Sequence, residues 1–343
     1  MKAWQIVKRG SLDGLSFVDL PVPHPGANEV VVRIRGVSIN YRDIIATRIE
    51  RPGALTPLIP CSDGAGEIVE VGSDVTKWHP GDRVIGCFFQ GWNSGRITRD
   101  VMRSDLGGPK HGVLAEYVTL DANAVVSVPE HMNFHQAATL PCAAVTAWHS
   151  LVVNGRLQPG ETVLLLGTGG VSIFALQFAK LAGARVIITS SSDAKLQRAR
   201  ELGADETINY RTYPDWSVRV HELTGKLGAD HVIEVGGAGT FEKSLESLRY
   251  GGQIHHIGVL SGFEGKINPW WITAKSAQVR GVYVGSREMF EEMNRAICLH
   301  RLEPVIHKVF NFSQAKEAFD LMERGGHLGK IVIGGWGAEA GVA

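Results

Sequence analysis

One glycine-rich segment has the spacing of a loop that binds phosphate groups. Residues 167–172 read G-T-G-G-V-S, between a β-branched, leucine-rich run at 162–166 and an apolar stripe of helical period over 171–181. Gly167 permits a tight turn, and Gly169 lets the backbone approach a pyrophosphate. The helix that starts at Gly170 and Val171 offers free amides to the phosphates. An ordinary glycine-rich turn is the alternative, but the strand and helix on either side favour a dinucleotide site.

The residue that ends the second strand bears on which dinucleotide is bound. NAD-specific domains place an acid about 20 residues beyond the first glycine, on the ribose hydroxyls. Here that position is Ser190, and Lys195 follows at the start of the next helix. A hydroxyl and an ammonium can both donate to a 2′-phosphate. We expect NADP(H) to be preferred over NAD(H); the alternative is a polar loop of helix-capping serines, with Asp193 turned toward the ribose.

Composition excludes several classes of protein. The chain has 343 residues, enough for two domains, with 35 Lys plus Arg against 35 Asp plus Glu. A neutral chain without a basic stripe argues against a nucleic-acid partner, and no apolar run approaches the roughly 18 residues of a membrane span. The N-terminus lacks the apolar core of a signal peptide. The four cysteines form no C-x-x-C pair, which favours reduced thiols in the cytoplasm.

The pattern of elements changes along the chain. Up to about residue 129, short β-type runs such as 29–34, 65–71 and 117–120 alternate with turns, which predicts a barrel-like β domain. From residue 161, apolar strands alternate with helices, which predicts a parallel sheet covered on both faces. The expected strands there are 162–166, 186–189, 231–235, 253–257 and 279–284. The expected helices are 171–181, 192–202, 241–248 and 289–300, followed by a helix near Ser313 and a strand at 330–333.

Four short segments resemble the medium-chain dehydrogenase/reductase superfamily. They are 64–72 (GAGEIVEVG), 78–84 (WHPGDRV), 115–117 (AEY) and 203–205 (GAD). The resemblance implies an α/β protein in which a doubly wound Rossmann sheet is inserted in a GroES-like β-barrel domain. The implied domains are a GroES-like first part at 1–126, a Rossmann domain at 127–294 and a GroES-like second part at 295–343.

The resemblance also bears on zinc. The positions that match the catalytic zinc ligands of the superfamily carry Asn40, Ser62 and Cys142, and residues 88–111 contain no cysteine for a structural zinc. Zinc needs about four soft or borderline ligands, so we expect no metal site. The chain is most similar to the zinc-free branch, which includes quinone oxidoreductases. An atypical zinc site built from Cys61, Asp63 and Cys142 is the alternative.

The resemblance implies catalytic residues in the segment that follows the third strand. Asn40 could donate its amide to cofactor or substrate, and Tyr41 could donate a proton to a carbonyl or enolate oxygen. Asp43 would hold the loop. The alternative is that all of them only shape a turn. Cys142 reads as a small buried hydrophobe, and the histidines as structural.

Further cofactor contacts follow from the same resemblance. They are Thr146 at the start of a helix, Tyr210 at the 2′-phosphate, and the main chain of Gly258 and Val259 at the nicotinamide. Helix packing is the alternative for Thr146. Trp270 and Trp271 could line a substrate pocket, a dimer contact or a core.

Together these features predict an NADPH-dependent, zinc-independent oxidoreductase that transfers hydride to a small carbonyl, quinone or conjugated enone. An alcohol dehydrogenase with zinc at an atypical site is one alternative. A nucleotide-binding RNA-binding or structural protein, like some zeta-crystallin relatives, is another. A homodimer is expected, because the strand at 278–284 presents an edge, and such edges meet across a two-fold axis in related quinone oxidoreductases.

Overall fold

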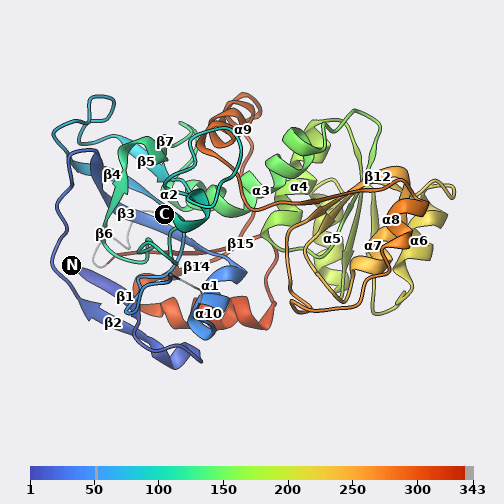
Figure 1. The fold of residues 1–343 in the computed structure, drawn as a ribbon, viewed down its shortest axis with the longest axis horizontal. Helices are drawn as coiled ribbons and strands as arrows, with labels where there is room; N and C mark the ends of the chain where they lie inside the picture. The colour runs from blue at the N-terminus through green and yellow to red at the C-terminus, as the bar shows by residue number, and fades with distance from the viewer. Residues whose placement is uncertain (51–52, 337–343) are drawn as a thin grey trace. The chain divides into compact units, whose positions relative to one another are not determined.

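The computed structural model describes residues 1–50 and 53–336, which divide into two compact units (Figure 1). Of the described residues, the first unit holds 1–50, 53–145 and 284–336, and the second holds 146–283. The sequence placed these boundaries at 126/127 and 294/295. The observed boundaries differ from the predicted ones because two helices pack on strands of the first unit and so belong to it. The helix α2 (Phe134–Ala137) packs on β3 (Glu29–Ile39), and α9 (Arg287–His300) packs on β7 (Val125–Ser127). Residues 337–343 of the predicted C-terminal segment lie outside the described residues.

The first unit is built on a seven-stranded sheet around β3. The strand order is β14-β15-β3-β4-β5-β7, and β6 pairs with β3 off this path. The strands are β3, β4 (Asp63–Val71), β5 (Arg83–Gly86), β6 (Tyr117–Asp121), β7, β14 (Ile306–Asn311) and β15 (Lys330–Gly334), with a separate hairpin of β1 (Lys2–Ile6) and β2 (Leu15–Asp19). The predicted strands at 29–34, 65–71, 117–120 and 330–333 all fall within these ranges. The sequence reading omitted β14.

The final strand β15 is held in place by an amphipathic helix. In α10 (Ala315–Arg324), the buried side chains are Ala315, Ala318, Phe319 and Met322, at the spacing of one helical face. The helix ends at Gly325, whose φ of +66° suits glycine. Because β15 pairs antiparallel with the end of β3, this packing brings Lys330 to residues 39–40.

The second unit is a six-stranded parallel sheet of order β10-β9-β8-β11-β12-β13. In chain order this is 3-2-1-4-5-6, the doubly wound Rossmann arrangement, so the predicted fold class is confirmed. The strands are β8 (Thr162–Leu165), β9 (Arg185–Ser190), β10 (Glu206–Asn209), β11 (Ala229–Glu234), β12 (Leu248–His256) and β13 (Gln278–Gly281). The helices are α3 (Val145–Trp148) at the boundary, α4 (Gly170–Leu181), α5 (Asp193–Glu201), α6 (Trp216–Leu223), α7 (Phe241–Ser247) and α8 (Trp270–Ala274).

The strand order places a switch point between β8 and β11, where the winding reverses. Ligands of doubly wound sheets bind beyond the carboxyl ends of the strands at this point. The glycine-rich loop leaves β8 here, and the turn that follows β11 lies beside it. The fold therefore predicts a ligand site at residues 166–172 and 234–237.

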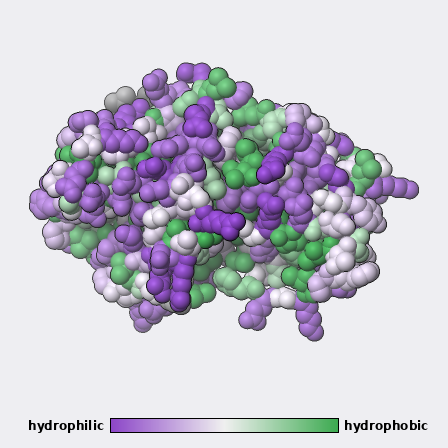
Figure 2. Space-filling view, turned by 45° about the horizontal axis from the view of Figure 1, so that its top comes forward, coloured by the Kyte–Doolittle hydropathy of each residue, from purple (hydrophilic) through white to green (hydrophobic). Residues whose placement is uncertain are grey.

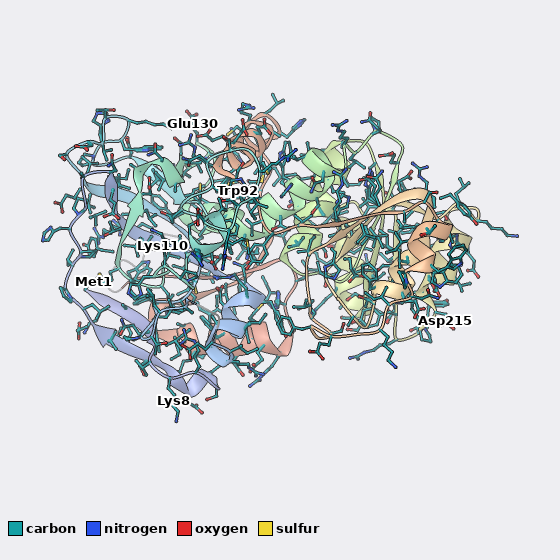
Figure 3. The ribbon with its side chains drawn as sticks, in the orientation of Figure 1. Met1, Lys8, Trp92, Lys110, Glu130 and Asp215 are labelled. Carbon is teal, nitrogen blue, oxygen red and sulfur yellow. The ribbon has the colours of Figure 1, made fainter. Side chains whose placement is uncertain are left out.

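The surface carries a mixture of polar and apolar side chains. Figure 2 shows hydrophilic residues interspersed with smaller hydrophobic patches. In Figure 3 the charged Lys8, Glu130 and Asp215 lie at the periphery, whereas Trp92 is buried. Within the described residues, every helix is too short or too polar to cross a membrane.

Candidate functional site

The loop between β8 and α4 has the geometry of a phosphate cradle. Gly167 has a φ of +72°, which favours glycine. A Cβ added to Gly167 or to Gly169 would meet no atom within 4 Å, so the loop faces open space. Gly169 is the N-cap of α4, and no described side chain caps this helix. The first-turn amides, including those of Gly170 and Val171, are therefore suited to bind an anion.

Ser172 takes over the packing role of a third glycine. It is buried in the first turn of α4, and its hydroxyl donates to the carbonyl of Leu166 at 2.7 Å. This bond ties α4 to the end of β8. The small side chain lets helix and strand approach each other, as the sequence predicted.

The ends of β9 and β10 bring together three residues proposed to read a 2′-phosphate. The Tyr210 amide donates to the Ser190 carbonyl at 3.0 Å, and the Ser190 hydroxyl accepts from the Ser192 amide at 3.3 Å. Ser192 caps α5 by accepting from the Lys195 amide at 3.4 Å. Burial lowers the pKa of Lys195, and the Tyr210 side chain is 41% exposed. Their contact with cofactor stays a prediction.

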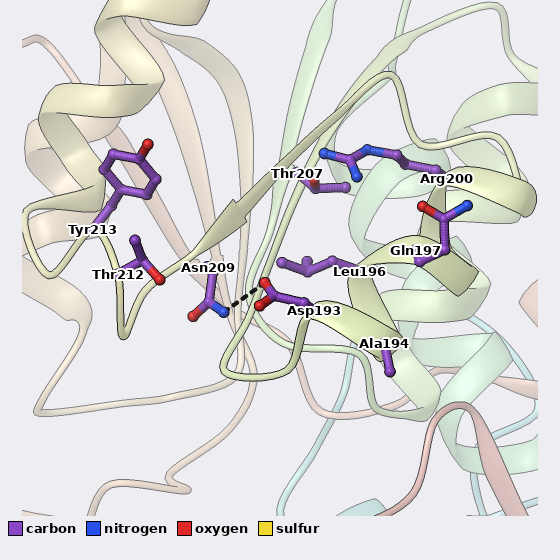
Figure 4. A pocket seen from close by; sticks show the side chains of 9 residues that line it. All are labelled: Asp193, Ala194, Leu196, Gln197, Arg200, Thr207, Asn209, Thr212 and Tyr213. Atoms are coloured by element: carbon purple, nitrogen blue, oxygen red, sulfur yellow. Dashed lines mark hydrogen bonds between the residues drawn. The ribbon is translucent and has the colours of Figure 1, made fainter.

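Beside these residues lies an open groove of about 610 Å³ between α5 and β10 (Figure 4). In it, the Asn209 side-chain amide donates to the Asp193 carboxylate at 2.8 Å. The lining residues are Asp193, Ala194, Leu196, Gln197, Arg200, Thr207, Asn209, Thr212 and Tyr213. Asp193, the acid that sequence reasoning allowed to turn toward the ribose, is directed into this groove.

The turn that follows β11 is organised by Glu234, which sequence reasoning missed. Its buried carboxylate accepts from the amides of Gly236 at 2.7 Å and Gly237 at 2.9 Å, and from the hydroxyls of Thr240 and Ser244. Its carbonyl accepts from the Gly258 amide at 3.2 Å. An acid that ends a buried strand before two glycines was the available signal.

Gly258 and Val259 are pinned against this turn. A Cβ on Gly258 would lie 2.2 Å from the carbonyl oxygen of Val235, so only glycine fits. The main chain here therefore has a fixed place at the carboxyl end of β12. Thr146, the remaining predicted cofactor residue, is buried on α3, and its carbonyl accepts from the Ser150 hydroxyl at 2.8 Å. Neither observation tests cofactor contact.

In the first unit, Asp43 holds the loop that carries Asn40. Asn40 is the N-cap of α1 (Tyr41–Arg48), and its backbone amide donates to the Asp43 carboxylate at 2.8 Å. Arg42 contacts Asp43 at 3.2 Å and Asp105 at 2.7 Å. Burial raises the pKa of Asp43 to about 6, opposed by the Arg42 guanidinium. Tyr41, in contrast, is 38% exposed on the first turn of α1.

A buried lysine from the far end of the chain completes this cluster. Lys330 is 2% exposed, and its ammonium donates to the Asn40 side-chain oxygen at 2.6 Å and to the Ile39 carbonyl at 3.0 Å. It lies 3.9 Å from a carboxylate oxygen of Asp63. Sequence reasoning missed Lys330, because a single lysine at the start of an apolar strand gives no signal of its partners.

Asp63 links the same cluster to two further segments. Its carboxylate accepts from the Ser62 hydroxyl at 2.6 Å and from the Cys142 amide at 3.2 Å. Burial raises the pKa of Asp63, and Lys330, Ser62 and the nearby Asn40 amide lower it. The side-chain nitrogen of Asn40 reaches no acceptor with full hydrogen-bond geometry among the described residues. It remains a buried donor.

These residues do not fit a catalytic zinc. No group of three His, Cys, Asp or Glu among the described residues has the arrangement of a metal site. Burial raises the pKa of Cys61 and of Cys142. These two thiols are fewer than the about four soft or borderline ligands that zinc needs. The Asp63 carboxylate is already engaged by Ser62, Cys142 and Lys330. A nicotinamide dinucleotide, in contrast, fits the open cradle at Gly167 and Gly169.

The fold and these sites define a two-part oxidoreductase with a dinucleotide-binding Rossmann unit. Residues 26–130 match the family "Alcohol dehydrogenase GroES-like domain", and residues 170–298 match "Zinc-binding dehydrogenase". The chain is 43% identical to the zinc-type alcohol dehydrogenase-like protein C1773.06c of Schizosaccharomyces pombe, over 90% of this chain and 91% of that protein. The chain therefore belongs to the medium-chain dehydrogenase/reductase superfamily.

Two solved structures show the same architecture at high similarity. A candidate alcohol dehydrogenase from Sinorhizobium meliloti 1021 has a TM-score of 0.90 and 41% identity, covering 97% of this chain and 98% of that chain. An NAD-dependent alcohol dehydrogenase has a TM-score of 0.89 and 35% identity, covering 97% and 99%. The chain is an oxidoreductase of this superfamily, of the alcohol dehydrogenase-like or quinone oxidoreductase-like kind.

Proposed function

We propose that this protein is an NADPH-dependent, zinc-independent reductase of small carbonyls, quinones or conjugated enones. The observation that carries the proposal is the buried network of Asn40, Asp63 and Lys330. By the family resemblance, Asn40 matches one catalytic zinc ligand of the zinc-dependent members, and Asp63 directly follows Ser62, which matches another. An ammonium in this network balances buried carboxylates without leaving a coordination site open.

The proposed roles of the residues follow from their placement. The Gly167–Gly169 loop and the α4 amides would bind the pyrophosphate, and Ser190, Lys195 and Tyr210 the 2′-phosphate. The bound nicotinamide supplies the hydride. Asn40 and Tyr41 would donate hydrogen bonds to the oxygen on which negative charge develops. Conjugate addition suits such a site, because an enolate oxygen needs donors and not a metal.

The second candidate is an alcohol dehydrogenase with zinc at an atypical site. It is favoured by the names of the zinc-type and NAD-dependent relatives. Against it stands the Asp63 carboxylate, which Ser62, Cys142 and Lys330 already engage. The name of the NAD-dependent relative also favours NAD(H) over NADP(H) as the cofactor of the second candidate. The NADPH preference rests on this chain's own Ser190 and Lys195.

We also propose a cytoplasmic homodimer without a nucleic-acid partner. All four cysteines are free, which suits a reducing compartment. Strand β13 ends the sheet of the second unit, and its four residues are exposed. Such an edge invites pairing with a second copy. The neutral charge argues against an RNA-binding role, and titration with RNA at graded salt would reveal one.

A cofactor-oxidation screen tests the proposed reaction. Purified protein of measured metal content is mixed with NADPH and a panel of quinones, enones, aldehydes and enoyl thioesters. We expect turnover with conjugated acceptors, unchanged by a chelator. Activity confined to alcohols and NAD, and lost with the metal, would favour the second candidate instead.

A further inference from the structure

Asn209 makes three hydrogen bonds at the end of β10, and two of them orient its side chain. Its main-chain carbonyl accepts from the Tyr213 amide at 2.8 Å, and its side-chain oxygen accepts from the Arg211 amide at 3.0 Å. Because a backbone N–H can only donate, the side-chain oxygen must face Arg211. The Nδ2 group is thereby directed to Asp193, 2.8 Å away.

In the sequence, Asp193 is the acid nearest to Ser190, the position that is expected to distinguish the two dinucleotides. The turn from β9 to α5 reads Ser190-Ser191-Ser192-Asp193, so Asp193 is the one acidic residue in it. A carboxylate here that faced the cofactor would bind ribose hydroxyls and repel a 2′-phosphate. In Figure 4 it is turned toward Asn209, in the groove that Gln197 and Arg200 also line.

We propose that Asn209 is a specificity-determining residue that acts by positioning Asp193. The hydrogen bond holds the carboxylate in the groove between α5 and β10 and leaves the end of β9 to the neutral Ser190. The inference rests on the proposed NADPH preference and deepens it. It assigns selectivity to a residue that need not touch the phosphate.

An isosteric substitution isolates the hydrogen bond. In Asn209→Asp, one side-chain oxygen still accepts from the Arg211 amide, so the turn is kept. The group that faces Asp193 becomes an oxygen, and two carboxylates then oppose each other. Asp193 is expected to leave the groove and bring its charge toward the phosphate. Both side chains are at the surface, which makes a folding failure a minor concern, and melting curves check it.

The matched control is the exchanged pair Asn209→Asp with Asp193→Asn. It has the net charge of the wild type and restores the hydrogen bond with donor and acceptor reversed. The probe is 2′,5′-ADP compared with 5′-AMP by calorimetry, since these differ only in the 2′-phosphate and need no reaction. The ratio of kcat/KM for NADPH and NADH is measured alongside.

We expect Asn209→Asp to reduce the preference for 2′,5′-ADP about five- to tenfold, and the exchanged pair to restore it. An unchanged preference in Asn209→Asp would overturn the inference while leaving the NADPH proposal intact. A loss that persists in the exchanged pair would also overturn it, because the charge at position 209 would then act directly. A wild type that binds both probes equally would refute the NADPH preference itself, and the inference with it.

Discussion

The Lys330 ammonium donates to the side-chain oxygen of Asn40 at 2.6 Å, although the two residues are 290 positions apart in the chain. This bond joins the last described strand to the segment that the sequence singled out for chemistry. Because lysine can only donate, it also determines that the oxygen end of the Asn40 amide faces it. The proposed site therefore depends on a residue outside every motif.

Removing the Lys330 charge should destabilise the protein strongly. In Lys330→Met, Asp63 loses its ammonium partner in a buried setting, which costs about 3–5 kcal/mol of the free energy of unfolding. Urea denaturation measures this. The double variant with Asp63→Asn removes the unpaired charge and should recover part of the loss. If Lys330→Met is as stable as the wild type, the ammonium does not balance Asp63.

His255 should make the protein less stable as the pH falls. It is buried against His231 at 3.3 Å, which in turn contacts Glu161 at 3.0 Å, and burial lowers the pKa of His255 to about 3. The unfolded chain binds this proton near pH 6.5 and the folded one only near pH 3. Stability from this residue is therefore complete above about pH 6.5 and falls by about 1.4 kcal/mol per pH unit below it.

The variant His255→Gln isolates that contribution. Its free energy of unfolding is compared with that of the wild type at each pH. Asp43, whose raised pKa makes the protein more stable as the pH falls, contributes equally to both proteins, so its effect cancels in the difference. We expect the difference between the two proteins to change with pH between about 6.5 and 3. His79→Gln, at an exposed position, serves as the control and should follow the wild type. Parallel curves for all three proteins would contradict the buried neutral imidazole.

Lys195 should contribute directly to cofactor choice. A charge-assisted contact with a phosphate is worth roughly 1.5–3 kcal/mol, so Lys195→Ala should lower kcat/KM for NADPH about ten- to a hundredfold. The value for NADH should change little. Lys226→Ala, at an exposed position of the same unit, is the control. Equal losses of kcat/KM with both cofactors would show that Lys195 does not recognise the 2′-phosphate.

The purified protein should hold no stoichiometric zinc. The reason is that, by the family resemblance, Asn40 and Ser62 stand where zinc-dependent members have metal ligands. In addition, the Asp63 carboxylate is already engaged by Ser62, Cys142 and Lys330. Elemental analysis before and after dialysis against a chelator measures the content, and activity is followed in both samples. A content of about one zinc per chain, whose removal abolishes turnover, would contradict this prediction.

A charge on the β13 edge should weaken the proposed dimer. Val279 is 37% exposed on this strand, and a two-fold axis would bring the same region of two copies together. We expect Val279→Lys to shift light scattering at micromolar concentration from dimer toward monomer. Val218→Lys, on the exposed face of α6, should leave the assembly unchanged. A monomeric wild type would refute the dimer outright.

The fold class and the glycine-rich turn proposed to bind phosphate could both be predicted from the sequence, because both rest on local patterns. Strand and helix periods around Gly167 and Gly169 identify a strand–turn–helix unit without knowledge of its neighbours. The same holds for Ser190, whose place follows from counting along the chain. Superfamily membership was likewise readable from four short segments.

Which polar groups meet depends on the assembled fold. Lys330 reaches Asn40 because β15 pairs with β3 in one register, and Asn209 reaches Asp193 because β10 lies beside β9. Glu234 likewise finds its partners across a turn and a neighbouring helix. Such contacts depend on strand order and register, which a one-residue shift would change. A single lysine or asparagine carries no periodic signal of its partner, so these relationships appear only once the sheets are assembled.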